Sequence, residues 1–561
     1  MPRRLLSALS ILSLGAALLA GCSSSPAVAQ VEQYSPKRAV GIPKLASLAR
    51  DTYVNGPISS KGGPFMTDRF GRTILLHGVN AVYKYAPYTL TVSPGQPNSL
   101  TTADARRIAL LGFNVVRVGI IWAGIEPGTG GPNQPQICTP GPSKDPGMWN
   151  EQVAQTYLSQ VAKVVDELGK YHIYSLLDMH QDVWSSLFGG EGAPPWATCT
   201  SGNPVVIYPG RWSKNYSNPA VDAAFNNFFA NSVVGGLQQE YQRSWKAVAT
   251  RFANEPWIVG YDPINEPLAL ARSDEDKRLY ATGLSCLYAG SGGRALEIGG
   301  SRDPLPCRST IPTTGLLTVL MRADPHHLVF PEVDNASYRS KTLFVSTGRD
   351  LSRTVYNFHD YCPERSGVTG NPTSLVACSN HELVHLIREE QYRPLYDNKE
   401  QPNGPAIMMT EFGATSDPEL ARDLTLDAST VGLSWTWWAW RYYDDPTGSS
   451  SEALINDQNQ FSPVAPILSE THAVAEAGTL LATQFAQATG NFTLVYQANT
   501  EIKAPTTIWI SPTTYTVGYC AYVSGGTITS KPGSPYLTVA NASNGATVVI
   551  RVEPGRCVAS L

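Results

Sequence analysis

Residues 258–267 read I-V-G-Y-D-P-I-N-E-P, an apolar run that ends in an amide, a carboxylate and a proline. A second run of this kind, A-I-M-M-T-E-F-G at residues 406–413, carries Glu411 near its end. Short apolar runs bounded by Pro or Gly are typical of buried parallel strands. A carboxylate at the C-terminal end of such a strand lies where a (β/α)8 barrel keeps its chemistry. Glu266 and Glu411 are therefore a candidate for the carboxylate pair that hydrolysis of a glycosidic bond requires.

Strand-like apolar runs alternate with helical stretches between residues 46 and 476, which is the pattern of repeated β-α units. Apolar residues recur at helical spacing over residues 151–168, and residues 221–252 are also expected to be helical. The expected strands are residues 73–80, 114–119, 174–180, 258–266, 328–334, 355–361, 406–411 and 433–440. We predict an α/β fold in which residues 46–476 form a (β/α)8 TIM barrel. Gly/Pro-rich insertions at residues 128–148 and 189–210 are expected to lie over its active face.

The last part of the chain, residues 477–561, has a different sequence pattern. Short runs rich in Thr, Val and Tyr alternate with turns that contain Gly, Pro and Asn. This pattern predicts a C-terminal antiparallel β-sandwich domain.

Charge and composition exclude one class of partner. The net charge is −4, the sequence pI is about 6.2, and basic residues do not cluster in runs. Binding to nucleic acid needs clustered Lys and Arg to neutralise phosphates, so we expect no nucleic-acid partner.

The first 22 residues are typical of a lipoprotein signal peptide. Two arginines precede an apolar stretch at residues 5–20, and L-A-G-C at residues 19–22 is followed by three serines. Cys22 is expected to become the lipidated first residue after cleavage, with residues 23–45 as a tether. The protein would then be exported and lipid-anchored to the outer face of the cell membrane. A plain secretory signal cut elsewhere, or a short uncleaved anchor, is the alternative.

Eight cysteines remain after Cys22, an even number that suits disulfides in an oxidising compartment. Sequence does not fix the connectivity, and near-neighbour pairing is the simplest proposal. It joins Cys138 with Cys199, Cys286 with Cys307, Cys362 with Cys378, and Cys520 with Cys557. The cysteine spacings do not resemble zinc ligands and no H-E-x-x-H run occurs, so we expect no metal and no cofactor.

The two glutamates suggest distinct roles. Glu266, preceded by Asn265, is expected to be the acid/base that protonates the leaving oxygen, while the Asn265 amide bonds a sugar hydroxyl. Glu411 is expected to be the nucleophile. A nucleophilic carboxylate needs a nearby cation to stay ionised, and Arg117 on the second strand is the candidate. Its alternative role is a buried ion pair elsewhere in the barrel.

Four more polar side chains end predicted strands: His180 and Asp182 after the third, and His359 and Tyr361 after the sixth. A buried polar group must find a partner, and a sugar hydroxyl or a catalytic carboxylate is a suitable one. A lone histidine is more often a satisfied core residue, but here two occur at equivalent strand ends. We therefore assign these residues to the site.

Four tryptophans crowd the last predicted strand, and aromatic faces are platforms for sugar rings. Because side chains alternate along a strand, at most half of them can face the barrel interior. We choose Trp438 as the platform, with Trp440 as the second candidate.

Together these motifs resemble the glycoside hydrolases of family five, through L-H-G-V-N, G-F-N-V-V-R, I-N-E-P, T-E-F-G and the eighth-strand tryptophan. D-M-H-Q-D-V-W-S, G-E-G-A-P-P-W-A and R-Y-Y-D-D-P-T-G are similar to the endoglycoceramidase branch of that family. The resemblance implies a retaining hydrolase that cuts between a glycan and ceramide and releases the glycan whole. It also implies that Lys84 and Asp182 contact the sugar nearest the lipid, and that the two carboxyl groups lie about 5–5.5 Å apart.

Other functions remain open at this point. A relative acting on a plain β-glucan, or on a glucolipid as a β-glucosidase, would share the same mechanism and the same two glutamates. A non-catalytic lipoprotein that binds carbohydrate or glycolipid at the cell surface is the alternative outside enzymes. In every case the partner is a glycan or glycolipid, and we expect a monomer.

Overall fold

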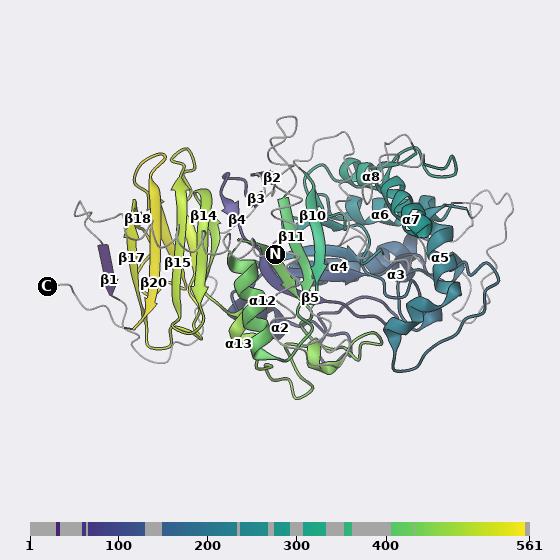
Figure 1. Ribbon diagram of the computed structural model, residues 1–561, viewed down its shortest axis with the longest axis horizontal. Helices are drawn as coiled ribbons and strands as arrows, with labels where there is room; N and C mark the ends of the chain where they lie inside the picture. Colours follow the sequence, from purple (N-terminus) through teal and green to yellow (C-terminus); the bar gives the residue numbers. More distant parts are fainter. Residues whose placement is uncertain are drawn as a thin grey trace, which may run out of the picture.

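The computed structural model describes residues 30–33, 59–62, 65–128, 149–232, 236–267, 274–291, 307–332, 353–361, 406–430 and 432–555. Two bodies lie next to each other along the long axis of the molecule (Figure 1). One is a barrel of strands surrounded by helices, and the other is a stack of antiparallel strands. The signal peptide, Cys22 and most of the predicted tether lie outside the described residues.

Eight parallel strands form one sheet in the order β10-β11-β12-β5-β6-β7-β8-β9. In chain order they are β5 (His77–Ala81), β6 (Val115–Ile120), β7 (Tyr174–Met179), β8 (Ile258–Asp262), β9 (Leu328–Val329), β10 (Val355–Asp360), β11 (Ala406–Phe412) and β12 (Ser434–Trp437). Two parallel bridges, Val329 with Thr354 and Glu332 with Asn357, join the β9 edge to the β10 edge. The sheet therefore closes, and the predicted (β/α)8 barrel is confirmed.

Each predicted strand segment overlaps one barrel strand, but residues 73–80 do not form a single strand. They divide into β4 (Thr73–Ile74), which pairs antiparallel with β13 (His472–Glu476), and β5, which pairs parallel with β6 and β12. Leu75 packs in the core of the antiparallel body, whereas Leu76 packs in the cluster beneath the barrel. Both sides of this run are buried, so its apolar pattern does not mark the point where the chain changes sheets.

Helices flank the barrel strands in the order expected for β-α units. They are α2 (Thr102–Leu110), α3 (Trp122–Ile125), α4 (Glu151–Gly169), α5 (Pro219–Phe229), α6 (Leu237–Phe252), α7 (Asp274–Ala289), α8 (Leu316–Ala323), α12 (Pro418–Thr430) and α13 (Ala465–Leu468). The helix predicted over 151–168 is confirmed. The single helix predicted over 221–252 is wrong: α5 and α6 are separate helices. Asn231 has φ +46° and Gly236 has φ +77°, and these left-handed conformations interrupt the helix between them.

The antiparallel body consists of two sheets, which confirms the predicted C-terminal sandwich. One is ordered β1-β17-β20-β15-β14 and the other β18-β19-β16-β13-β4-β3-β2. The strands not yet given are β1 (Gln30–Gln33), β2 (Ser59–Gly62), β3 (Phe65–Thr67), β14 (Gly478–Ala486), β15 (Asn491–Ala498), β16 (Thr506–Trp509), β17 (Tyr519–Ser524), β18 (Gly526–Ile528), β19 (Tyr536–Asn541) and β20 (Thr547–Pro554). Strands that precede the barrel in the sequence therefore complete both sheets, and β4 leads directly into the first barrel strand.

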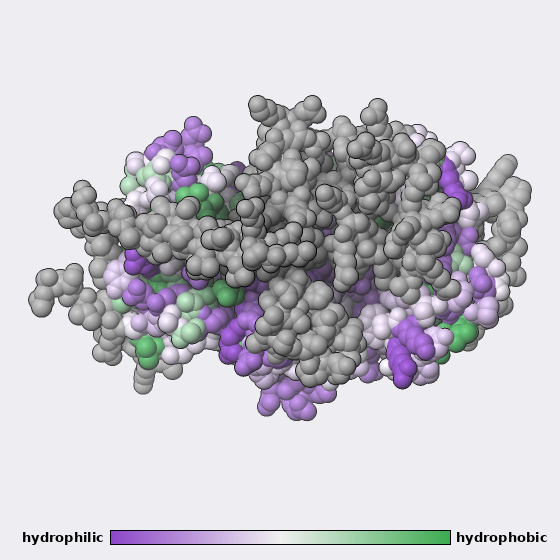
Figure 2. All heavy atoms as spheres, viewed as in Figure 1, coloured by the Kyte–Doolittle hydropathy of each residue, from purple (hydrophilic) through white to green (hydrophobic). Residues whose placement is uncertain are grey.

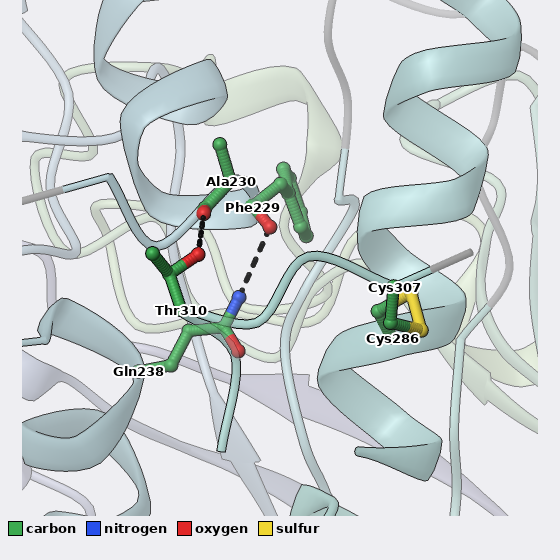
Figure 3. Close-up of a disulfide and its surroundings, with 6 residues drawn as sticks. All are labelled: Phe229, Ala230, Gln238, Cys286, Cys307 and Thr310. Carbon is green, nitrogen blue, oxygen red and sulfur yellow. Dashed lines mark hydrogen bonds between the residues drawn. A yellow bond between two sulfur atoms is a disulfide. The ribbon is translucent and has the colours of Figure 1, made fainter. Parts of the chain in front are cut away.

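A disulfide joins Cys286 on α7 to Cys307, as predicted, with a Cα–Cα distance of 5.6 Å (Figure 3). Close by, the Thr310 hydroxyl donates to the carbonyl of Ala230 at the end of α5 (2.9 Å). The segment after Cys307 is thus tied to both helices. Cys199 and Cys520 are each disulfide-bonded as well. Their predicted partners, Cys138 and Cys557, and the predicted pair Cys362 and Cys378, lie outside the described residues.

Within the described part of the chain, none of the helices has both the length and the apolar character that a membrane crossing requires. On the face seen in Figure 2, hydrophobic residues are scattered among hydrophilic ones wherever the surface is coloured.

Candidate active site

The predicted site residues meet at the C-terminal ends of the barrel strands. Arg117 and Glu411 lie on β6 and β11, whereas the others come at or just after the end of a strand: His180 after β7, Asn265 and Glu266 after β8, His359 and Tyr361 at the end of β10, and Trp438 after β12. This is the face on which (β/α)8 barrels build active sites. Parallel strands have brought residues up to about 300 positions apart into one cluster, since Arg117 and Glu411 are 294 positions apart.

Glu411 is held at both carboxylate oxygens. Nη1 of Arg117 donates to Oε1 at 2.5 Å, and the Tyr361 hydroxyl donates to Oε2 at 2.7 Å. The residue is only 4% exposed. A carboxylate fixed at two points by a cation and a hydroxyl has one orientation, which suits a nucleophile that must attack along one line.

Glu266 is held differently, through its backbone and through a histidine. Its φ of +36° is unusual for a residue with a side chain, and its N–H donates to Oε2 of Glu332 at 2.8 Å. Oε1 lies 2.9 Å from Nδ1 of His359. The Glu266 side chain is 16% exposed, compared with 5% for that of Glu411, so the more accessible of the two carboxyl groups is the predicted acid/base.

The two carboxyl groups are close together. One oxygen of Glu266, one oxygen of Glu411 and a ring nitrogen of His359 all lie within 4.8 Å of one another. Retaining glycosidases separate their carboxyl groups by about 5–5.5 Å and inverting ones by about 6.5–9.5 Å. The arrangement therefore fits direct attack by one carboxylate and leaves too little room for a water between the pair.

Arg117 is the electrostatic centre of the site. Besides Glu411, it contacts Asp178 (2.9 Å) and Asp262 (2.8 Å), and it is fully buried. Burial alone would lower the pKa of Arg117, but the surrounding carboxylates outweigh burial and raise it well above its ordinary value. Burial raises the pKa of Asp262 to about 7, against the opposing effect of Arg117. Arg117 is thus in a buried ion-pair network, and that network includes Glu411.

The two histidines of the site carry different charges. Burial lowers the pKa of His359 to about 3, despite the nearby Glu411, so its ring is neutral between the two glutamates. His180 is buried too, but the carboxylate of Asp178, 2.6 Å from Nδ1, overcomes burial and raises its pKa to about 10. His180 is therefore a cation at neutral pH and His359 is not.

Asn265 is engaged largely with protein groups. Its side-chain oxygen accepts from Nη2 of Arg117 (2.8 Å), and its Nδ2 donates to the carbonyl of Gln181 (3.0 Å). An amide nitrogen has two N–H groups, and among the described residues Nδ2 makes this one hydrogen bond, so its second N–H is a candidate donor to a sugar hydroxyl.

A second cluster lies beside the carboxylate pair, around Lys84 and Asp182. Nζ of Lys84 contacts Asp182 (2.6 Å), Asp445 (2.9 Å) and the hydroxyl of Thr447 (2.6 Å). Burial acts to lower the pKa of Lys84, but the neighbouring carboxylates raise it well above its ordinary value. The same Nζ lies 4.5 Å from the ring centroid of Trp438, in cation–π geometry.

The structure separates the two tryptophan candidates. Trp438 stacks on His180 at 5.4 Å with an interplanar angle of 12°, so it belongs to the site. Trp440 is fully buried, and its indole N–H donates to Asp104 of α2. It packs near Phe461, at the outside of the barrel, and is not brought to the carboxylates. The regular alternation assumed for this segment fails because β12 ends at Trp437.

Among the residues that the structure describes, two groups of side chains have donor sets that could hold a metal ion. They are His180, Asp182 and Glu191, and Glu266, His359 and Glu411. Each group already contacts a protein cation, because Lys84 lies against Asp182 and Arg117 lies against Glu411. These cations supply the positive charge that a metal would otherwise contribute.

Sequence reasoning assigned no role to several residues of this site. Asp445 and Thr447 lie within R-Y-Y-D-D-P-T-G and Glu191 lies within G-E-G-A-P-P, two motifs of the family resemblance that do not by themselves single out these residues. Glu332 lies two residues before the end of the predicted fifth strand, residues 328–334, and carries an acid signal like that of Glu266. An acid near a strand end is therefore a signal that could have identified Glu332.

Comparison with known proteins assigns the family. The model of cellulases, described as glycosyl hydrolase family 5, matches residues 81–444. The chain belongs to glycosyl hydrolase family 5. The model of the family 5 C-terminal domain matches residues 471–552, which are the strands of the sandwich from β13 onward. This family 5 chain is therefore a glycoside hydrolase with the family's own accessory domain.

Among curated proteins, the family 5 chain is 26% identical over 507 residues to endoglycoceramidase I of Rhodococcus hoagii (strain 103S), with 88% of each chain covered. It is 32% identical over 226 residues to an endoglycoceramidase of Cyanea nozakii, which covers 36% of this chain and 40% of that protein. Among solved structures, endo-glycoceramidase II from Rhodococcus sp. in complex with ganglioside GM3 matches with a TM-score of 0.65 at 20% identity, over 88% of this chain and 100% of that one. Its likeness supports the two-body fold.

Proposed function

We propose that this family 5 protein is a retaining endoglycoceramidase, which hydrolyses the β-glycosidic bond between a glycan and ceramide and releases the glycan whole. The observation that carries the mechanism is the approach of the Glu266 and Glu411 carboxyl oxygens to within 4.8 Å on the active face of the barrel. The similarity that supports the substrate is the match to endoglycoceramidase I, because it spans both domains.

In the first step Glu411 attacks the anomeric carbon and the bond to the ceramide oxygen breaks. Glu266 gives its proton to that oxygen, so ceramide leaves neutral and a covalent glycosyl-enzyme remains. Arg117 and Tyr361 hold the two oxygens of Glu411 during the attack. Neutral His359 lies against Glu266 without adding a positive charge that would stabilise its carboxylate form.

In the second step Glu266, now a carboxylate, takes a proton from water. The resulting hydroxide attacks the anomeric carbon, the ester bond to Glu411 breaks, and the anomeric configuration is restored. The proton taken from water leaves Glu266 protonated as at the start, so the enzyme is ready for a further cycle.

Lys84, Asp182 and Trp438 are the glycan-binding residues in this proposal. Lys84 has three donors, and the contacts to carboxylates fix its position beside the Trp438 ring. A sugar ring stacked on Trp438 would place its hydroxyls within reach of a buried cation and a carboxylate. Such fixed charged partners favour hydroxyl-rich ligands over apolar ones.

We also propose that the protein is exported and lipid-anchored through Cys22 to the outer face of the cell membrane, with secretion as the alternative. The support is the N-terminal sequence, in which L-A-G-C follows an apolar stretch preceded by two arginines. An anchored enzyme would meet amphiphilic substrates at a membrane surface.

The test is to incubate purified protein with glycosphingolipids of differing headgroup and with cello-oligosaccharides, and to identify products by mass spectrometry beside a Glu411→Gln control. Intact glycan plus ceramide, absent with the control, is the expected result. Shortened cello-oligosaccharides with untouched glycolipids would make the protein a β-glucanase. Glucose released from simple glucolipids alone would make it a β-glucosidase. Binding without turnover would make it a surface lectin.

A further inference from the structure

We propose that Glu332, an acid outside the nucleophile and acid/base pair, is a positioning residue that holds Glu266 in its working conformation. The inference rests on the proposed role of Glu266 as acid/base. It concerns how that role is maintained, because Glu332 is fully buried and contacts both Glu266 and His359.

The first observation is the backbone of Glu266. With φ at +36°, Glu266 is in a conformation that L-residues with a side chain rarely adopt. Such conformations persist where neighbouring structure enforces them. Here the Glu266 N–H donates to Oε2 of Glu332 at 2.8 Å, so the bond acts on the residue whose conformation needs support.

The second observation is that the same Glu332 oxygen also faces the partner of the Glu266 carboxyl. Oε2 lies 3.6 Å from Nε2 of His359, and the other ring nitrogen, Nδ1, lies 2.9 Å from Oε1 of Glu266. Glu332 therefore acts on Glu266 in two ways. It accepts a hydrogen bond from the Glu266 backbone, and it lies against the His359 ring that contacts the Glu266 carboxyl group.

The third observation is that the position of Glu332 is itself fixed. The residue is fully buried and forms the parallel bridge with Asn357 that helps to close the barrel. Its backbone carbonyl accepts from the hydroxyl of Tyr288 at 2.9 Å. A carboxyl group whose backbone is fixed by this bridge is a more rigid support than one on an unpaired loop.

Glu332 is expected to act as a neutral acid. Its Oε1 has no hydrogen-bond partner among the described residues. Burial raises the pKa of Glu332 well above its ordinary value, and the nearby carboxylates of Asp262 and Glu266 add to that effect, whereas Arg117 opposes it. The other titratable groups that face it are His359, Tyr288 and Tyr356.

The test compares Glu332→Gln with Glu332→Ala, using aryl β-glycosides of one glycan with a good leaving group (dinitrophenyl) and a poor one (phenyl). A good leaving group needs no proton from Glu266, so only the poor one reports on the acid. General acid–base catalysis contributes about 10²–10⁴-fold. We expect Glu332→Ala to lower kcat/KM for the poor leaving group by about 100-fold or more, and for the good one by less than about tenfold.

The glutamine variant keeps an acceptor for the Glu266 N–H and adds no charge. We expect kcat/KM of Glu332→Gln for the poor leaving group to lie within about tenfold of the wild-type value, a smaller loss than the full acid–base contribution. The basic limb of the pH profile for that substrate should stay at the wild-type pH. A fall of that limb to lower pH would show that Glu332 carries a negative charge, and would overturn the neutral-acid part of the proposal.

Glu476 on β13 provides the matched control, because it is also fully buried and neither of its carboxyl oxygens has a hydrogen-bond partner among the described residues. Glu476→Ala should leave the ratio of the two kcat/KM values unchanged. The proposal is wrong if Glu332→Ala loses activity equally on both substrates, or loses none, while wild type is active. A wild type inactive on every glycoside would instead refute the proposed function.

Discussion

Replacing Tyr361 by phenylalanine removes one oxygen atom from the site and tests how Glu411 is held. The hydroxyl of Tyr361 donates to Oε2 of Glu411 at 2.7 Å, while Arg117 holds Oε1. The ring itself packs against the cluster that contains Trp438, and that packing survives the substitution. Burial and the nearby Glu411 raise the pKa of Tyr361 well above its ordinary value, so the hydroxyl remains a donor throughout the usual assay range.

The expected loss follows from the strength of this bond. A hydrogen bond to a charged group contributes about 1.5–3 kcal/mol. With about 1.36 kcal/mol for each tenfold in rate, Tyr361→Phe should lower kcat/KM by about 10- to 150-fold. The variant should still fold, with a loss of stability no larger than the energy of this one bond, because no apolar contact is removed.

Steady-state kinetics on one glycolipid and one aryl glycoside, with thermal unfolding of the same samples, provide the assay. Tyr515→Phe is the matched control, since its hydroxyl donates to the carbonyl of Gly490 at 2.8 Å in the sandwich, away from the site. That variant should lose stability, by about 1 kcal/mol, and keep its kcat/KM. The account is refuted if a folded Tyr361→Phe protein has kcat/KM within about threefold of wild type, because that loss is far smaller than the bond energy implies. Tyr361 would then not be needed to hold Glu411.

Three further predictions concern charge and cross-linking. Lys84→Met should abolish glycolipid turnover and lower stability by about 3–5 kcal/mol, because it leaves Asp182 and Asp445 buried without the Lys84 cation. Lys170→Met removes an exposed cation that pairs with Glu167 and should cost less than about 1 kcal/mol. Equal losses in thermal unfolding would contradict the burial argument. Burial raises the pKa of Glu476 to about 8 from an ordinary 4.5, so the folded state retains a proton that the unfolded state loses, and stability falls as pH rises through that interval. At about 1.36 kcal/mol per pH unit, Glu476→Gln should be more stable than wild type at pH 8 by up to about 5 kcal/mol, and this gain should disappear near pH 4.5. A gain independent of pH would show that the raised pKa of Glu476 is not its cause. Replacing both Cys286 and Cys307 by serine should cost about 3 kcal/mol in unfolding experiments under oxidising conditions, and no difference from wild type would mean that the cross-link is absent in solution.

The fold was largely predictable because parallel barrel strands are buried on both faces and therefore appear as short apolar runs. The eight segments were found for that reason, and the polar residues at their ends mark the active face. The division of residues 73–80 between β4 and β5 was not predictable by the same reasoning. It depends on pairing of β4 with β13, some 400 positions later, and no local pattern encodes that partner.

The site was predictable where a polar residue interrupts an apolar run, as at Glu266, His359 and Glu411. It was less so where the chain leaves its strand. Trp438 and Trp440 have the same spacing signal, and only the end of β12 at Trp437 determines that one stacks on His180 and the other packs outside the barrel.

The conformation of Glu266 could not be read from the sequence either. A glutamate does not predict a φ of +36°. The conformation depends on a hydrogen bond to Glu332, which comes 66 positions later. Contacts of this kind depend on the closed barrel, and local preferences do not reveal them.

Trapping the glycosyl-enzyme tests the central claim most directly. A β-glycoside with fluorine in place of the 2-hydroxyl and an activated leaving group should react once and accumulate as a covalent adduct, since fluorine slows the second step. Digestion and mass spectrometry should locate the sugar on the peptide that contains Glu411, and Glu411→Gln should give no adduct. A sugar attached to another residue, or an active enzyme that forms no adduct and releases a product of inverted configuration, would contradict the account.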